Sequence, residues 1–251
     1  MRSAIFVSIF LVLALHCTFA ANSFLASTLG SHMVLQRGVS TSVYGWSSVA
    51  SSTVTVTMGT STYSATSSAS PSAAGGFFWQ VPLPAMAASL LGTDIHISST
   101  AGEAAALFDL LFGDVFFCSG QSNMQFAMPG VLDAQQQIAR ADNYSAIRIF
   151  DVGQDMNQPQ SVNPLDDLFS LRRGWTVCPS NALPPMAPAP MQRLRAPLTP
   201  RQVGSAAAVN SGDWTSYYSA VCWLTAAEIF DTQLQRSVPI GLVSSNWVMH
   251  A

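Results

Sequence analysis

The pattern of apolar residues changes near residue 110, and this change constrains the fold more than any other feature of the chain. Before it, short apolar segments at 34–35, 42–46, 54–58, 77–81 and 95–98 are separated by glycines, as strands are separated by turns. Val54, Val56 and Met58 alternate with two threonines, which is the period of a half-buried strand. Residues 21–109 are therefore predicted to form a small all-β domain.

After residue 110 strands and helices alternate. Apolar runs without alternation lead up to residue 118, which is typical of a strand buried on both faces. A helix is predicted at 135–140, a strand at 146–152, a long helix at 217–235 and a strand at 240–245. This order predicts an α/β domain over 110–251, with a parallel sheet and right-handed crossovers.

One segment does not fit a compact domain. Residues 178–213 contain seven prolines and almost no hydrophobic periodicity. Structureless segments of this length are uncommon between packed elements. The segment is therefore a surface insertion or an error in the gene model, and the sequence does not separate the two.

Composition excludes several classes of protein. Of the 251 residues 49% are hydrophobic and 9% charged, which is not the composition of a disordered chain. The net charge is −3, and the ten basic residues are all arginines without a dense cluster. Nucleic acid is therefore not an expected partner.

The first twenty residues have the pattern of a signal peptide. Arg2 precedes an apolar run at 4–15, and small residues follow at Thr18 and Ala20. The run is short for a membrane span and lacks a basic flank, so no stable membrane insertion is expected after cleavage. We expect a secreted glycoprotein, or one in the lysosomal or endomembrane lumen. Asn143 begins the sole Asn-x-Ser/Thr sequon, and we expect it to be exposed and glycosylated.

Three cysteines remain after the signal peptide, namely Cys118, Cys178 and Cys222. An odd number allows one disulfide and one free thiol, and the sequence does not say which two pair. Cys118 and Cys222 lie in apolar runs, where both can equally be buried thiols. No Cys or His pair has the spacing of zinc ligands, so no metal is expected.

The run from Phe112 to Met124 is the segment most suited to chemistry. A buried strand leads into Ser119-Gly120-Gln121-Ser122-Asn123, where a glycine allows a sharp bend before a helix. A serine hydroxyl at this place is presented above the sheet edge, beside helix amides that can stabilise an oxyanion. Serine is also a preferred N-cap, so the residues alone support a nucleophile and a cap equally.

The run Phe-Gly-Asp-Val-x-x-Cys-Ser-Gly-Gln-Ser-Asn-Met at 112–124 resembles the nucleophile block of the sialate O-acetylesterase family, a group of SGNH-type hydrolases. Three further stretches agree in family order: His-Met-Val-Leu-Gln-Arg at 32–37, Ser-Ala-Val-Cys-Trp-Leu at 219–224 and Pro-Ile-Gly-Leu-Val-Ser-Ser at 239–245. The resemblance covers about residues 24–247. It implies an N-terminal β-domain followed by an α/β esterase domain.

The resemblance also implies a reaction and its residues. Ser122 is the implied nucleophile, and its backbone amide is the implied oxyanion donor. Gly120, Gln121 and Asn123 complete the nucleophile turn. The implied substrate is an O-acetylated sialic acid or another acetylated sugar, deacetylated through an acyl-enzyme without cofactor or metal.

The resemblance ends after Trp247. Val-Met-His-Ala at 248–251 stands where the family continues Gly-Gly-Thr, and the family's Gly-Glu-Ser-Asn and Asp-x-x-His blocks have no counterpart. His32 and His96 precede the nucleophile, His250 has nothing after it to fix its position, and Asp114 has the place of a turn residue. We therefore expect a C-terminally incomplete esterase domain, and a poor esterase or none.

Two alternatives follow from this departure. One is a secreted, inactive carbohydrate-binding protein, with Trp46, Phe77, Phe78 and Trp79 as the sugar platform. The other is a truncated gene product without a function of its own.

The signal peptide gives the first testable prediction. Secreted protein should begin next to Ala20 or Ala21, because signal peptidase cleaves after small residues. Mass spectrometry of the N-terminal peptide of secreted material checks this. Secreted chains that retain Met1 would contradict the prediction.

Overall fold

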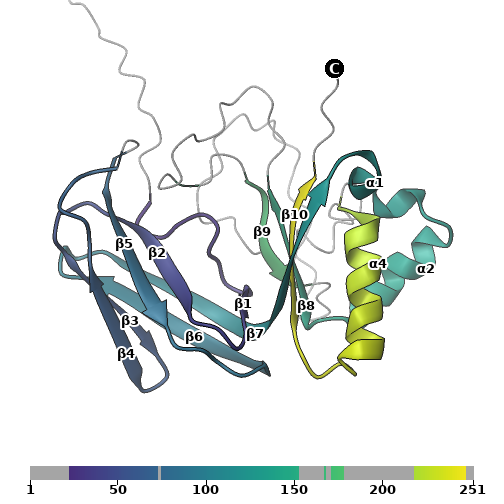
Figure 1. Ribbon diagram of the computed structural model, residues 1–251, viewed down its shortest axis with the longest axis horizontal. Coiled ribbons are helices and arrows are strands. Elements are labelled where there is room, and N and C mark those ends of the chain that lie inside the picture. The colour runs from purple at the N-terminus through teal and green to yellow at the C-terminus, as the bar shows by residue number, and fades with distance from the viewer. Residues whose placement is uncertain (1–22, 73–74, 153–166, 168–170, 178–217, 247–251) are drawn as a thin grey trace, which may run out of the picture.

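The computed structural model describes residues 23–72, 75–152, 167, 171–177 and 218–246. The predicted signal peptide, the proline-rich segment, Cys178 and His250 lie outside these residues. In the described part, most strands belong to one mixed sheet and the helices gather beside its C-terminal half (Figure 1).

The N-terminal half is built from strands. They are β1 (Val34–Gln36), β2 (Thr41–Ser47), β3 (Thr53–Met58), β4 (Ser61–Thr66), β5 (Phe77–Leu83) and β6 (Ser89–Ser99). β2 and β5 form an antiparallel pair, and β4, β3 and β6 follow one another in the main sheet. The strands predicted from residue 34 to residue 98 are confirmed, and β4 is an addition.

β7 (Ala104–Gly120) is the longest strand and joins the two halves. Its first part pairs with β6 antiparallel, and Leu111–Gly113 pairs with β1 in parallel. Its last part, Asp114–Gly120, pairs in parallel with β10 (Ile240–Asn246). The expected domain boundary after residue 109 therefore falls inside a continuous strand, and the division into two domains stays a prediction.

The C-terminal half contains the predicted parallel strands. β10 lies between β7 and β8 (Ile147–Val152) and is parallel to both. β9 (Leu171–Val177) adds an antiparallel strand outside β8, which the sequence did not predict. The sheet is therefore mixed rather than wholly parallel.

The helices lie beside these strands. They are α1 (Ser122–Gln125), α2 (Ala134–Arg140) and α4 (Ala220–Glu228). The long helix predicted at 217–235 changes after α4 into a π-helical turn, Ile229–Gln233. The shorter α-helix still begins where Ser219 accepts a hydrogen bond from the amide of Cys222, a typical N-cap.

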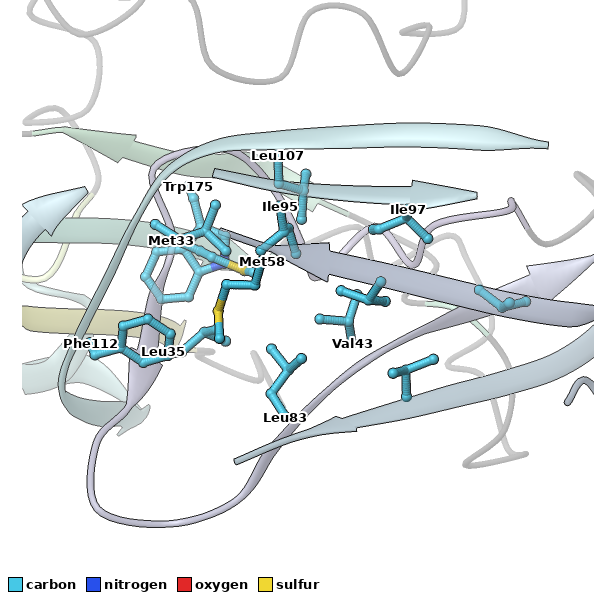
Figure 2. Packing of buried hydrophobic residues seen from close by; sticks show 14 of the residues in the cluster. Met33, Leu35, Val43, Met58, Leu83, Ile95, Ile97, Leu107, Phe112 and Trp175 are labelled. Carbon is cyan, nitrogen blue, oxygen red and sulfur yellow. The ribbon is translucent and has the colours of Figure 1, made fainter. Parts of the chain in front are cut away.

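Two clusters of buried apolar side chains stabilise the sheet. The first lies between β7, β8, β10 and α4, and includes Ile149, Trp223 and Leu242. The second fills the N-terminal half but includes Phe150 and Trp175 of β8 and β9. Figure 2 shows Trp175 among Met33, Leu107 and other members of this second cluster. The two halves therefore share a core as well as a strand.

A charged cluster lies where β7 bends between the halves. Asp109 has a left-handed backbone, with φ 57°, and its Oδ2 atom is 2.8 Å from both Nδ1 of His32 and a terminal nitrogen of Arg148. Arg148 comes from β8 and is buried. Burial raises the pKa of Asp109, but hydrogen bonds from Arg148 and His32 outweigh it and hold this pKa below its ordinary value.

This cluster predicts an acid-sensitive contribution to stability. With a folded pKa below its ordinary value, ionised Asp109 stabilises the fold at pH values above about 4, and the effect is lost as the pH falls through the folded pKa. Asp109→Asn should lose less free energy of unfolding than the native protein between pH 6 and pH 3. Asparagine tolerates the left-handed backbone, and the exposed Asp142→Asn is the control. Identical acid dependence of the native protein and Asp109→Asn, measured by urea unfolding, would contradict the assignment.

Candidate active site

Ser122 follows the carboxyl end of β7, where the neighbouring strand β10 also ends. Gly120, the last residue of β7, is opposite Asn246, the last residue of β10. Ser122 is exposed, together with Gln121 and Asn123. Open α/β sheets bind ligands at the carboxyl ends of their strands, so the turn lies where a substrate can reach it.

Gly120 has a backbone that suits glycine. Its φ is +150°, and a Cβ at this position would lie 3.1 Å from Cβ of Met124. A larger residue would push against the first turn of α1 as well as strain its own backbone. The glycine therefore allows the chain to reverse closely enough to present Ser122 immediately after the strand.

The structure does not support a capping role for Ser122. The N-cap of α1 is Gln121, and no side chain makes a capping hydrogen bond there. Ser122 is the first helical residue instead. Among the described residues no hydrogen bond to its hydroxyl occurs, so this hydroxyl is available to a ligand.

A disulfide fixes the strand that carries the turn. Cys118 of β7 is bonded to Cys222 of α4, with 5.9 Å between their Cα atoms and a sequence separation of 104. The alternative of two buried thiols is therefore wrong. In the chain-entropy description, a disulfide that closes a loop of this length stabilises the fold by roughly 4–5 kcal/mol. The amide of Ala220 also donates to the carbonyl of Phe126 at 2.8 Å, so α4 holds both ends of the turn.

An apolar pocket of about 260 Å³ lies between β7 and α4. Its lining includes Phe116, Phe117, Val221, Ile229 and the disulfide. The prediction that β7 is buried on both faces is wrong here, because Phe116 and Phe117 are 38% and 68% exposed. Among the described strands only β10 pairs with this part of β7. Ser122 is not in the lining.

Asp114 is engaged far from the serine turn. Nε of Arg37 donates to Oδ1 of Asp114 at 2.8 Å, and a terminal nitrogen of Arg37 donates to Oδ2 at 3.0 Å. Gln36 beside it accepts a hydrogen bond from the amide of Val115 at 2.9 Å. Gln36, the last residue of β1, and Arg37 after it therefore anchor this end of β1 to the Gly-Asp-Val segment, and Arg37 engages both carboxylate oxygens of Asp114.

The described histidines lie far from Ser122. His32 binds Asp109, and His96 is opposite Ala106 with its ring edge-on to that of Phe108. Extended strand from Asp109 to Gly120 spans on the order of 30 Å. Neither imidazole is therefore placed to accept a proton from Ser122.

The described residues hold neither a candidate metal centre nor a candidate membrane span. No group of three or more His, Cys, Asp or Glu side chains that would suit a metal ion occurs in the described ranges. In the same ranges no helix is both long enough and apolar enough to span a membrane.

Asn143 ends a short 3-10 helix (Ala141–Asn143) and is exposed, as glycosylation of its sequon requires. Its glycosylation stays a prediction.

Comparisons with known proteins identify the relatives of the chain. No family model matches it. It is 32% identical over 235 residues to the sialate O-acetylesterase of Mus musculus, covering 88% of this chain and 35% of that protein. The Homo sapiens sialate O-acetylesterase is 30% identical over 139 residues, 55% of this chain and 20% of that protein. The chain is related to the sialate O-acetylesterases.

A solved structure supports the same relation. A carbohydrate acetylesterase from Xanthomonas citri aligns with a TM-score of 0.61 and 25% identity, over 89% of this chain and 40% of that one. The mixed sheet with few helices is consistent with the fold of such an esterase. The chain spans about a third of the length of the mouse sialate O-acetylesterase, 35%.

The ion pair of Asp114 gives a prediction for this relative of the esterases. Asp114→Asn should lower the midpoint of thermal unfolding, because it breaks the bidentate contact with Arg37. It should leave unchanged the shape of the pH profile of any ester hydrolysis that the chain shows. Arg37→Met, which breaks the same contact from the residue after β1, should have the same effect. A lost limb of the pH profile in Asp114→Asn alone would show that Asp114 transfers a proton.

Proposed function

We propose that this chain carries the nucleophile of an esterase that removes O-acetyl groups from sialic acid or a related sugar. The observation that carries the proposal is the exposed Ser122 on the Gly120 turn, at the carboxyl ends of β7 and β10. The similarity to sialate O-acetylesterases and to a carbohydrate acetylesterase supports the reaction and the substrate class. The SGNH-type character of the domain is part of the same proposal.

The reaction uses the Ser122 hydroxyl as the attacking group. Its Oγ forms a bond to the acetyl carbon and loses its proton to a base, which delivers that proton to the sugar oxygen as the ester bond breaks. Water then attacks the acetyl-serine and gives a proton to the base, which returns it to Oγ as acetate is released. The Ser122 amide, at the first position of α1, has no partner within the helix and is the proposed oxyanion donor.

The general base is proposed to come from outside the described residues. His32 and His96 are held at the far end of β7, and Asp114 is bound by Arg37. Loss of a triad member leaves on the order of 10³-fold catalysis over water from binding and oxyanion stabilisation. We therefore expect slow turnover while no base is in place beside Ser122.

Maturation and location belong to the proposal as well. A signal peptide at 1–20, secretion or residence in a lumen, and a glycan on Asn143 suit a protein that meets sugar substrates outside the cytosol. The disulfide between Cys118 and Cys222 fits an oxidising compartment. An N-terminal β-domain would support the esterase domain through β7.

The alternative of an inactive glycan-binding protein has less support. Its sugar platform needs exposed aromatic faces, but Trp46 and Trp79 are 2% and 0% exposed. Phe78 lies against Trp46, with 5.8 Å between the ring centroids. These side chains pack in the N-terminal half rather than forming a binding surface.

The proposal predicts slow acetate release that depends on Ser122. The full chain, secreted from eukaryotic cells, is assayed with an O-acetylated sialic acid and with an activated acetyl ester. Ser122→Ala should remove the enzymatic rate, a loss of about a thousandfold or down to background. Ser119→Ala is the matched control, because Ser119 is also exposed at the end of β7.

The contrary outcomes are distinct. Equal rates in Ser122→Ala and the native chain would remove Ser122 from the mechanism. Release from the activated ester but not from the acetylated sugar would overturn the substrate class.

A further inference from the structure

The turn that carries Ser122 does little to hold itself in place. α1 has four residues and no capping side chain. Its backbone bonds are those from the amide of Gln125 to the carbonyl of Gln121, at 3.0 Å, and from Phe126 to Asn123, at 3.3 Å. Isolated helices shorter than about 12 residues are marginal in water, so a single turn depends on its neighbours.

The neighbours hold this turn through Met124. Its side chain covers Gly120, and its sulfur accepts a hydrogen bond from the hydroxyl of Ser219 at 3.1 Å. Its backbone carbonyl accepts a hydrogen bond from Nδ2 of Asn246 at 3.1 Å. Met124 lies two residues after Ser122, so its position sets where the serine hydroxyl stands.

The hydrogen bond from Asn246 ties Met124 to the end of β10. Asn246 is the last residue of β10, it is opposite Gly120, and it is 2% exposed. Its Nδ2 atom also donates to the hydroxyl of Ser244 at 3.1 Å. A buried amide costs free energy unless its hydrogen bonds are made, so this side chain is directed by its bonds rather than by apolar packing.

We propose that Asn246 is a positioning residue for Ser122, acting through the carbonyl of Met124. This inference rests on the proposed function of Ser122 as the nucleophile. The disulfide joins β7 to α4, and Asn246 joins β10 to α1. The serine turn is therefore held from α4 on one side and from β10 on the other.

The test compares three variants of the full chain with the native protein. Asn246→Ala removes the hydrogen bond to Met124. Asn246→Asp keeps the shape but donates only when its carboxyl is protonated. Ser245→Ala, at the adjacent half-buried position on β10, is the matched control. Each variant is first checked for an intact Cys118–Cys222 disulfide by thiol titration.

Activity on an activated acetyl ester should respond in kcat. Asn246→Ala should lower kcat by about tenfold to a hundredfold, with little change in KM, because the nucleophile is displaced while substrate contacts persist. Asn246→Asp should recover toward the native rate as the pH falls, since its protonated acid can donate to the Met124 carbonyl. Ser245→Ala should match the native protein.

Hydrogen exchange provides a readout that does not depend on catalysis. In Asn246→Ala the amides of Gln125 and Phe126 should exchange at least tenfold faster, while those of β7 and β10 keep native rates. If Asn246→Ala fails to fold, Asn246→Asp decides by its pH-dependent exchange at the same amides. Native kcat and native exchange in a folded variant would overturn the proposal.

The exchange result also separates this inference from the proposed function. A native chain without Ser122-dependent hydrolysis would end the esterase proposal. Faster exchange of the turn in Asn246→Ala would still support the anchoring contact in that case.

Discussion

The pairing of β7 with three other strands is the interaction on which the rest of the structure depends. One end of β7 is bound to β6 and β1, and the other to β10. Its side chains enter both apolar clusters, with Leu107, Leu110 and Phe112 in one and Cys118 in the other. The serine turn therefore follows the carboxyl end of a strand whose first part is packed in the core of the N-terminal half.

Motifs that lie far apart in the sequence all contact β7 in this arrangement. Gln36 and Arg37 bind the Gly-Asp-Val segment of β7, at the amide of Val115 and the carboxylate of Asp114. Cys222, at the start of α4, binds Cys118 nearer the tip. Each motif contacts β7 at a different point along the strand. The esterase chemistry is proposed only at the carboxyl end of β7. A β-rich N-terminal half thus has a structural role in presenting Ser122, the proposed nucleophile.

Much of this could be predicted from sequence, because local periodicity carries it. The alternation of Val54, Val56 and Met58 predicted β3, and the Gly120 bend placed Ser122 at a strand end. β4 was missed because its residues, Ser61–Thr66, are polar and mostly exposed and give no hydrophobic signal.

Contacts between distant segments were beyond the sequence. The pairing of Cys118 with Cys222 depends on how α4 lies against β7, and the bond from Asn246 to Met124 spans 122 residues. The inner position of β10, between β7 and β8, depends on the same packing.

The central claim is that Ser122 becomes acetylated during turnover. Rapid acid quench of the full chain with an activated acetyl ester, followed by peptide mass spectrometry, should find one acetyl group on Ser122. Acetate release with the acetyl group on another residue, or with no acetylated peptide at any quench time, would contradict the account.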